Sequence, residues 1–147
     1  MDDMISVEIL LVEDNLQDAE LTIRSLRKHK LANNVCVVED GAEALDFIFC
    51  RGKYAKRDTK QPPRVIFLDL KLPLVSGLEV LRAVKQDTST RSIPVVVLTS
   101  SREDPDIKTA YELGANSYVV KPVDFESFTK AIGEIGLYWL LINQPPK

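Results

Sequence analysis

Four apolar runs in this 147-residue sequence each end in side chains that could bind or transfer a charged group. They are Val7–Val12 with Glu13-Asp14, Val65–Leu68 with Asp69, Val95–Leu98 with Thr99, and Ser117–Val120 with Lys121-Pro122. If the acids cluster they need a cation, because unit charges about 4 Å apart interact by roughly 4 kcal/mol at an effective dielectric of about 20. Mg²⁺ suits such a site, since it prefers hard oxygen ligands and binds carboxylates together with phosphate oxygens.

The same residues would complete a site for phosphoryl transfer. Asp69 has the chemistry of a nucleophile that accepts the group, while Lys121 and Thr99 could hold its remaining oxygens. Taken alone, Asp69 is more simply interpreted as the cap of the following helix. The case for chemistry therefore depends on whether the fold brings the four run ends together.

The apolar runs are typical of strands buried on both faces, as in a parallel sheet. Between them the apolar spacing changes to three and four, which indicates amphipathic helices. One such set is Leu16, Ala19, Ile23 and Leu26. Five strands alternating with five helices predict an α/β fold with a doubly wound, five-stranded parallel sheet. Its strands end at one edge, so Glu13, Asp14, Asp69, Thr99 and Lys121 are expected to meet there.

Several helix ends carry signals of their own. Asp40 and Glu43 have the spacing of a capping box. Asp104 could cap a helix with Pro105 at its first position and Gly114 at its end. The last helix should follow Asp124 and bury Phe125, Phe128, Ile132, Ile135 and Trp139.

Length and composition indicate one domain over residues 1–147. The net charge of -3 argues against nucleic acid and anionic membranes as partners. The first four residues, MDDM, lack the basic start of a signal peptide, and no apolar run reaches the roughly 20 residues of a membrane span. A cytoplasmic protein is expected, with Cys36 and Cys50 as buried free thiols.

Residues 51–64 form the most basic segment, with six cations against one acid, Asp58. Pro62-Pro63 excludes a continuous helix, so an exposed loop is expected before the strand that ends at Asp69. A docking surface for an acidic partner and a solvated connection both stay open, and the solvated connection is the simpler interpretation.

In this order and at these strand ends, Glu13-Asp14, Asp69, Thr99 and Lys121-Pro122 resemble the receiver domain of two-component response regulators. The resemblance covers about Val7 to Leu141, which would be the core of a single receiver domain without an output domain. It implies the (βα)5, flavodoxin-like receiver fold. It makes Asp69 the phosphoacceptor. It also makes Asp14, Asp69 and the backbone carbonyl of Lys71 ligands of Mg²⁺, with Glu13 acting through water.

The resemblance further implies that Lys121 binds the phosphoryl group and that a cis peptide bond joins Lys121 to Pro122. Phosphorylation would draw Thr99 toward the new oxygens and turn an aromatic residue of the fifth strand, Tyr118 here, inward. The simpler alternative is a half-buried strand tyrosine with no switching role.

The sequence contains no nucleotide-binding loop of the form GxxxxGK[ST], and its one histidine, His29, is interpreted as a surface cation near a helix end. The phosphoryl donor is therefore expected to be a separate sensor histidine kinase. The chain itself would be no enzyme beyond its own phosphorylation and slow dephosphorylation.

The long basic loop and the apolar stretch 136–142 are similar to single-domain regulators paired with phytochrome-type sensor kinases. This stretch holds more apolar surface than one helix stripe needs. We expect a homodimer that uses Tyr138, Trp139 and Ile142, and an output through docking to an unidentified downstream protein.

Three other functions stay open. An aspartyl-phosphate hydrolase would carry the motif Asp-x-Asp, whereas Asp69-Leu70-Lys71 has Lys at the position of the second acid. A flavodoxin-like binder would need a Ser/Thr/Gly-rich phosphate loop where Glu13-Asp14 stands. A receiver-shaped module that is never phosphorylated is the third, and the intact set of acids argues against it.

Overall fold

The computed structural model describes residues 7–31 and 34–146, so the acidic first residues lie outside the described part. The strands are β1 (Ile9–Val12), β2 (Val35–Val38), β3 (Val65–Leu68), β4 (Val95–Thr99) and β5 (Ser117–Val120). They pair in parallel in the order β2-β1-β3-β4-β5. This confirms the doubly wound five-stranded sheet.

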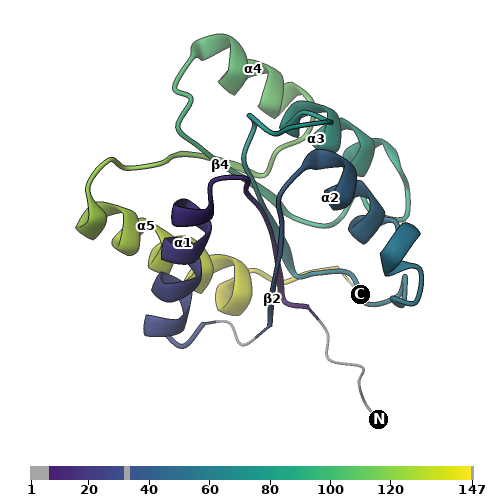
Figure 1. Cartoon of the computed structure of the whole chain (residues 1–147), viewed down its shortest axis with the longest axis horizontal. Coiled ribbons are helices and arrows are strands. Elements are labelled where there is room, and N and C mark those ends of the chain that lie inside the picture. Colours follow the sequence, from purple (N-terminus) through teal and green to yellow (C-terminus); the bar gives the residue numbers. More distant parts are fainter. Residues whose placement is uncertain (1–6, 32–33, 147) are drawn as a thin grey trace.

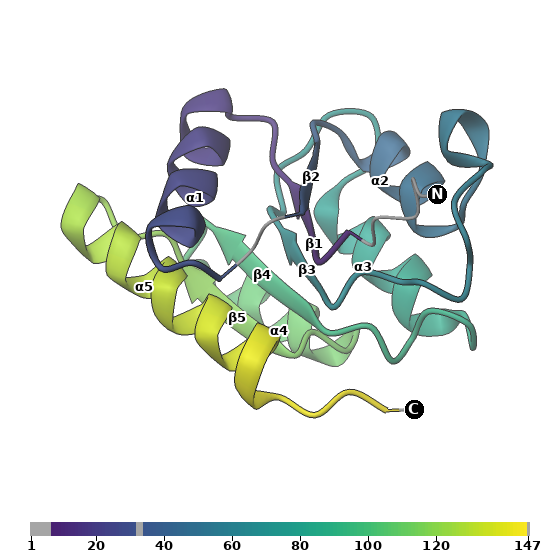
Figure 2. The same cartoon turned by 90° about the horizontal axis from the view of Figure 1, so that it is seen from below.

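Five α-helices cover the sheet: α1 (Leu16–Lys28), α2 (Gly41–Ile48), α3 (Gly77–Gln86), α4 (Asp104–Glu112) and α5 (Phe125–Leu137). Figures 1 and 2 show α1 and α5 on one face of the sheet, with α2, α3 and α4 on the other. A separate hydrophobic cluster fills each interface. None of the described helices has the length and apolar composition of a membrane span.

Burial along the strands follows their place in the sheet. The central strands β1, β3 and β4 are buried at every position, because helices cover both of their faces. The edge strands β2 and β5 are mostly half-buried. Cys36 lies on β2 and, like Cys50, is a free thiol that is only half-buried, so the expectation of buried thiols was wrong.

The interface between α1 and α5 is more polar than the apolar spacing predicted. Thr22 and Ser25 are buried there. Their hydroxyl groups are satisfied within the helix, because Thr22 donates to the Asp18 carbonyl and Ser25 to the Leu21 carbonyl, both at 2.8 Å. Leu16, which was expected on the buried side of this helix, is 64% exposed.

Two helices begin at the capping residues that the sequence predicted, and the start of a third is shifted by one residue. The carboxylates of Asp40 and Asp124 accept from backbone N–H groups three residues on, at 2.7 and 2.8 Å. In α4 the cap is Glu103, without a side-chain bond, and Asp104 is the first helical residue. Phe125 opens α5 on its outer side and is 56% exposed, contrary to expectation.

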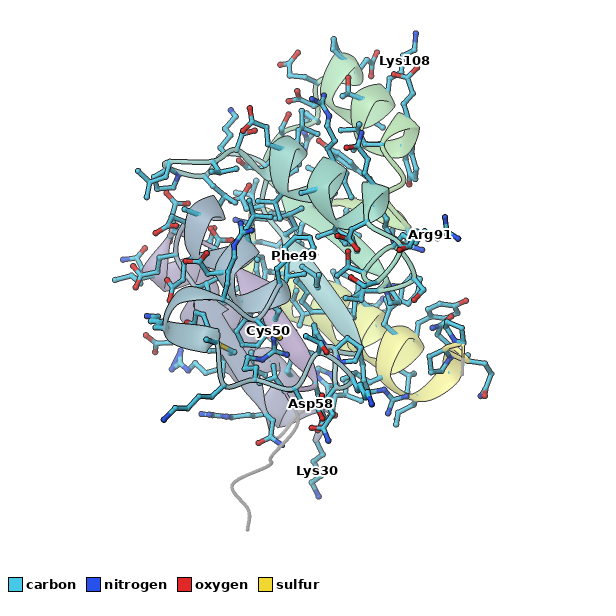
Figure 3. All side chains as sticks on the ribbon, turned by 90° about the vertical axis from the view of Figure 1, so that its right-hand side faces the viewer. Lys30, Phe49, Cys50, Asp58, Arg91 and Lys108 are labelled. Carbon is cyan, nitrogen blue, oxygen red and sulfur yellow. The ribbon has the colours of Figure 1, made fainter. Side chains whose placement is uncertain are left out.

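The basic segment is anchored to α2. It contains a short 3-10 helix, Gly52–Tyr54. The Arg57 guanidinium lies 3.7 Å from the Phe47 ring centroid and donates to the Phe47 carbonyl and to Cys50 Sγ. Cys50 and Asp58 lie on the face that Figure 3 presents.

Two more of its six cations pair with α2. Arg51 contacts Asp46 at 3.1 Å, and Lys53 contacts Glu43 at 2.8 Å. Three of the six cations are therefore engaged in contacts within the chain, which favours a solvated connection over a docking surface for an acidic partner. The remaining cations, Lys56, Lys60 and Arg64, are exposed.

Candidate functional site

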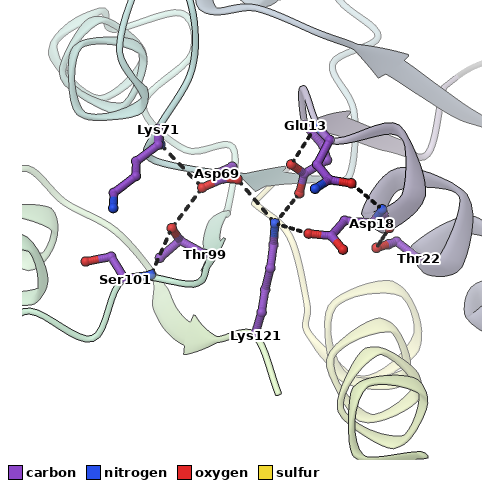
Figure 4. Close-up of polar contacts among 9 residues, drawn as sticks. Glu13, Asp18, Thr22, Asp69, Lys71, Thr99, Ser101 and Lys121 are labelled. Carbon is purple, nitrogen blue, oxygen red and sulfur yellow. Dashed lines mark hydrogen bonds and ion pairs between the residues drawn. The ribbon is translucent and has the colours of Figure 1, made fainter. Parts of the chain in front are cut away.

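The carboxyl ends of four strands converge on one small site (Figure 4). Its polar side chains are unusually buried: Thr99 is 0% exposed, Glu13 2%, Asp69 8% and Lys121 9%. Asp14, next to Glu13, is exposed. The structure thus brings together the residues that the sequence predicted, because parallel strands all end at the same edge of the sheet.

The Lys121 ammonium group lies at the centre of the site. Its Nζ contacts Glu13 Oε1 at 2.5 Å, Asp18 Oδ2 at 2.9 Å and Asp69 Oδ2 at 3.2 Å. An ammonium has three N–H donors, so these contacts use its full capacity. Lys121 therefore partly neutralises a group of acids that would otherwise repel one another.

Asp69 is held from a second side by Thr99 and by its own loop. The Thr99 hydroxyl donates to Asp69 Oδ1 at 2.8 Å, and the backbone N–H of Lys71 donates to the same oxygen at 3.3 Å. Lys121 approaches the other oxygen, Oδ2. The carboxylate is thus oriented by donors on both of its oxygens, which is the preorganisation a nucleophile needs.

These surroundings separate the acidities of the two buried carboxyl groups. Burial raises the pKa of Glu13 to about 7, more than the nearby Lys121 lowers it. Burial also acts to raise the pKa of Asp69, but the charge of Lys121 and the hydrogen bond from Thr99 outweigh it and hold that pKa below its usual value. Asp69 is therefore ionised at neutral pH, as an acceptor of a phosphoryl group must be.

Burial acts to lower the pKa of Lys121, but its bonds to Glu13 and Asp18 outweigh burial, so this pKa lies above its ordinary value. The side chain is therefore a permanent cation at physiological pH. It can attract the oxygens of a phosphoryl group without any change in protonation.

Three carboxyl groups could hold a metal ion at the exposed side of the site. Oxygen atoms of Glu13, Asp14 and Asp69 all lie within 4.8 Å of one another. Such a set of hard oxygens, with no nitrogen or sulfur ligand among them, fits a hard divalent cation rather than zinc.

The β3–α3 loop fixes the backbone of Asp69 against the start of α3. A Cβ atom on Gly77 would lie 2.2 Å from the Asp69 carbonyl oxygen and 2.6 Å from Leu70 Cα. Only glycine allows this close approach. The position of Asp69 is therefore set by the strand before it and by the helix start after it.

Asp18 also belongs to this site, although it was not among the residues predicted to meet there. Its carboxylate reaches Lys121 at 2.9 Å. The available signal was its spacing: it lies four residues after Asp14, in the first turn of the helix that follows β1.

Ser101 connects the site to α4 and β5. Ser101 is buried, and its hydroxyl donates to Asp106 Oδ2 at 2.6 Å, which ties it to α4. Its backbone N–H donates to the Thr99 hydroxyl at 3.4 Å, and its carbonyl accepts from the Tyr118 hydroxyl at 2.9 Å. Asp69 is thus linked through Thr99 and Ser101 to Tyr118, which is half-buried.

The peptide bond between Lys121 and Pro122 is trans, as are all peptide bonds in the described part of the chain. The expectation of a cis bond was wrong. The Lys121 side chain reaches all three carboxylates from the trans form, which X–Pro bonds favour by roughly 0.5–1 kcal/mol.

Comparison with known proteins gives matches in both sequence and fold. A family model described as the response regulator receiver domain matches residues 9–133. The response regulator Rcp1 of Synechocystis is 36% identical over 132 residues, which cover 90% of this chain and 88% of Rcp1. The crystal structure of its Mn²⁺-bound form superposes with a TM-score of 0.88 at 34% identity, covering 97% of this chain and all of that one.

Two further solved structures are similar over nearly the whole chain. The phosphorylated cyanobacterial phytochrome response regulator RcpA has a TM-score of 0.89 at 34% identity, covering 97% of this chain and 100% of its own. The bacteriophytochrome response regulator AtBRR is 52% identical with a TM-score of 0.74, covering 95% and 100%.

The substitution Asp14→Asn tests whether the acids repel one another and bind a metal together. Without metal, we expect the free energy of unfolding to stay level or rise by about 1 kcal/mol, because one repelling charge is removed from a partly exposed cluster. We also expect Mg²⁺ to raise the melting temperature of the wild type but not of the variant.

Thermal unfolding with and without Mg²⁺ checks both effects, with Asp104→Asn on α4 as a control that removes a charge outside the cluster. Equal stabilisation of Asp14→Asn and wild type by Mg²⁺ would contradict the assignment of Asp14.

Proposed function

Because the chain belongs to the response regulator receiver domain family, we propose that Asp69 accepts a phosphoryl group from the phosphohistidine of a sensor histidine kinase. The observation that carries this proposal is the placement of Asp69 between Thr99 at 2.8 Å and Lys121 at 3.2 Å, next to two further acids. A site with a positioned carboxylate, a hydroxyl donor and a fixed cation has the parts that phosphoryl transfer requires.

In the transfer step, a carboxylate oxygen of Asp69 forms a bond to phosphorus while the bond between phosphorus and the donor imidazole nitrogen breaks. The imidazole leaves in neutral form after it takes a proton from solvent, and Asp69 becomes an acyl phosphate. Lys121 and the Thr99 hydroxyl are placed to hold oxygens of the transferred group. Water could later cleave the acyl phosphate, giving slow dephosphorylation.

Mg²⁺ would be held by Asp14, Asp69 and the backbone carbonyl of Lys71, with Glu13 acting through water. When bound, it supplies positive charge against the carboxylates and the phosphoryl oxygens. The three converging carboxyl groups support this assignment, and the related Rcp1 has been crystallised with Mn²⁺.

Receiver domains are signalling proteins, and we propose that this one acts in the cytoplasm. Its kinase would be of the phytochrome type, which the likeness to RcpA and AtBRR supports. Its output would be docking to a downstream protein rather than DNA binding, in line with a net charge of -3.

Intact-mass measurement after incubation with acetyl phosphate and Mg²⁺ tests the phosphoacceptor. We expect one added phosphoryl group on the wild type and on the control Asp104→Asn, and none on Asp69→Asn, because the amide cannot act as the nucleophile. An adduct on Asp69→Asn would place the acceptor elsewhere, and rapid multiple turnover of acetyl phosphate would favour the hydrolase.

Tyr118 would report phosphorylation through Thr99 and Ser101. Its hydroxyl already bonds to the Ser101 carbonyl, and Ser101 in turn contacts Thr99, so movement of Thr99 toward phosphoryl oxygens would change the place where Tyr118 packs. We expect beryllofluoride, a phosphoryl mimic, to reduce the solvent exposure of Tyr118. Solvent-perturbation spectra of the wild type, with Tyr118→Phe as the reference, check this, and unchanged exposure would contradict a switch role.

The end of α5 would form a homodimer interface. The π-helix Tyr138–Ile142 continues α5 (yellow in Figure 2). Within it, Leu140 is buried and Trp139 packs against the hydrophobic cluster on the α1 and α5 side of the sheet. Tyr138 is 46% exposed and Ile142 55%, next to exposed Leu137 and Leu141. This leaves one apolar strip on the outer side of the helix.

Light scattering with and without beryllofluoride tests the dimer. We expect Ile142→Glu to weaken association at least about tenfold, or about 1.4 kcal/mol, because it places a charge in an apolar contact. Tyr111→Glu, at an exposed aromatic residue on α4, is the control and should associate like the wild type. A wild-type monomer at high concentration in both states would contradict the dimer.

A further inference from the structure

The contacts of Lys121 point to a function for Asp18, a residue outside the family pattern described above. We propose that Asp18 is a positioning residue that competes with the phosphoryl group for the Lys121 ammonium. This inference rests on the proposed phosphorylation of Asp69. It concerns how strongly the phosphoryl group is held once it is there.

The distances show which partners hold Lys121 in the unphosphorylated chain. The ammonium lies closer to Glu13, at 2.5 Å, and to Asp18, at 2.9 Å, than to Asp69, at 3.2 Å. All three donors of the ammonium are occupied. A phosphoryl group on Asp69 can take over the donor that now contacts Asp69, but it gains a second bond from Lys121 only if the contact to Glu13 or to Asp18 is weakened.

Burial indicates that the contact to Asp18 is the one that opens. The Asp18 side chain is 33% exposed, whereas that of Glu13 is 2% exposed. Water can hydrate the Asp18 carboxylate after the ammonium moves away, while the buried Glu13 would lose the partner that offsets its desolvation. Asp18 can thus give up Lys121 at low cost.

The backbone around Asp18 fixes where its carboxylate can reach. Its N–H donates to the Asn15 side chain at 3.0 Å, and its carbonyl accepts from the Thr22 hydroxyl at 2.8 Å. The residue belongs to the first turn of α1, which is packed against α5. The backbone position of Asp18 relative to Lys121 is therefore fixed. Its carboxylate is not one of the three that could hold a metal ion.

Both consequences of the Asp18 charge have the same sign for a bound phosphoryl group. The carboxylate repels the anionic oxygens and also shares the cation that attracts them. An asparagine keeps an oxygen acceptor at the same place but has no charge, so it leaves Lys121 oriented and releases it more readily. The neutral variant should therefore bind the phosphoryl group more tightly than the wild type.

Calorimetric titration of the full chain with beryllofluoride at saturating Mg²⁺ tests this. We expect Asp18→Asn to lower the apparent dissociation constant by about three- to tenfold, within the range of charge-assisted contacts at partly exposed sites. Asp18→Glu, which keeps the charge, should stay near the wild type. Glu20→Gln removes the same charge from the exposed face of α1 without contact to Lys121 and should change the constant less than about twofold.

A double-mutant cycle separates the shared cation from a general charge effect. In a Lys121→Met background, the effect of Asp18→Asn should shrink to the part that comes from direct repulsion of the phosphoryl oxygens. If it persists undiminished, or if Asp18→Asn binds no more tightly than the wild type, the inference is wrong. Should Lys121→Met fail to fold, as thermal unfolding will show, the comparison of Asp18→Asn with Glu20→Gln decides: equal effects overturn the inference.

The outcome for the wild type separates the two proposals. A wild type that binds no beryllofluoride and gains no phosphoryl adduct would overturn the phosphoacceptor function of Asp69. A wild type that binds and is phosphorylated, with Asp18→Asn unchanged, would overturn the role of Asp18 alone.

Discussion

The site depends on one interaction, the contact of the Lys121 ammonium with three carboxylates. Glu13 and Asp69 are nearly buried, and their charges could not share so small a space without a cation. The single ammonium does not balance all of the acids, because Asp14 adds further negative charge at the exposed side. Because of this imbalance, the site attracts a divalent cation, and several carboxyl groups compete for the Lys121 ammonium.

The rest of the fold holds these charges in place. β1, β3 and β4 are buried along their whole length, so the residues at their ends have little freedom to move apart. The close approach of Gly77 to the Asp69 carbonyl adds a second anchor behind the acceptor. Repulsion between the acids is thus opposed by the packing of the core, and a bound cation would reduce this repulsion.

The polar links that lead away from Asp69 run in two directions. One passes through Thr99 and Ser101 to Tyr118 on β5 and to Asp106 on α4. The other passes through Lys121 to Asp18 on α1. A change of charge at Asp69 can therefore alter contacts on both faces of the sheet, since α1 and α4 lie on opposite faces.

The sequence alone determined the strand and helix order and the five residues at the sheet edge. Strongly apolar runs have one stable place in an α/β fold, and parallel strands must end together. Capping residues at Asp40 and Asp124 were equally local signals, and they were confirmed.

Only the tertiary structure decided which contacts those residues make. Asp18 reaches Lys121, Thr22 and Ser25 are buried, the cations Arg51, Lys53 and Arg57 pack onto α2, and Lys121 precedes a trans proline. Each of these outcomes joins residues from different elements or depends on the space between them. Periodicity and spacing describe one segment at a time, so they locate the strand ends but not the partners that packing provides.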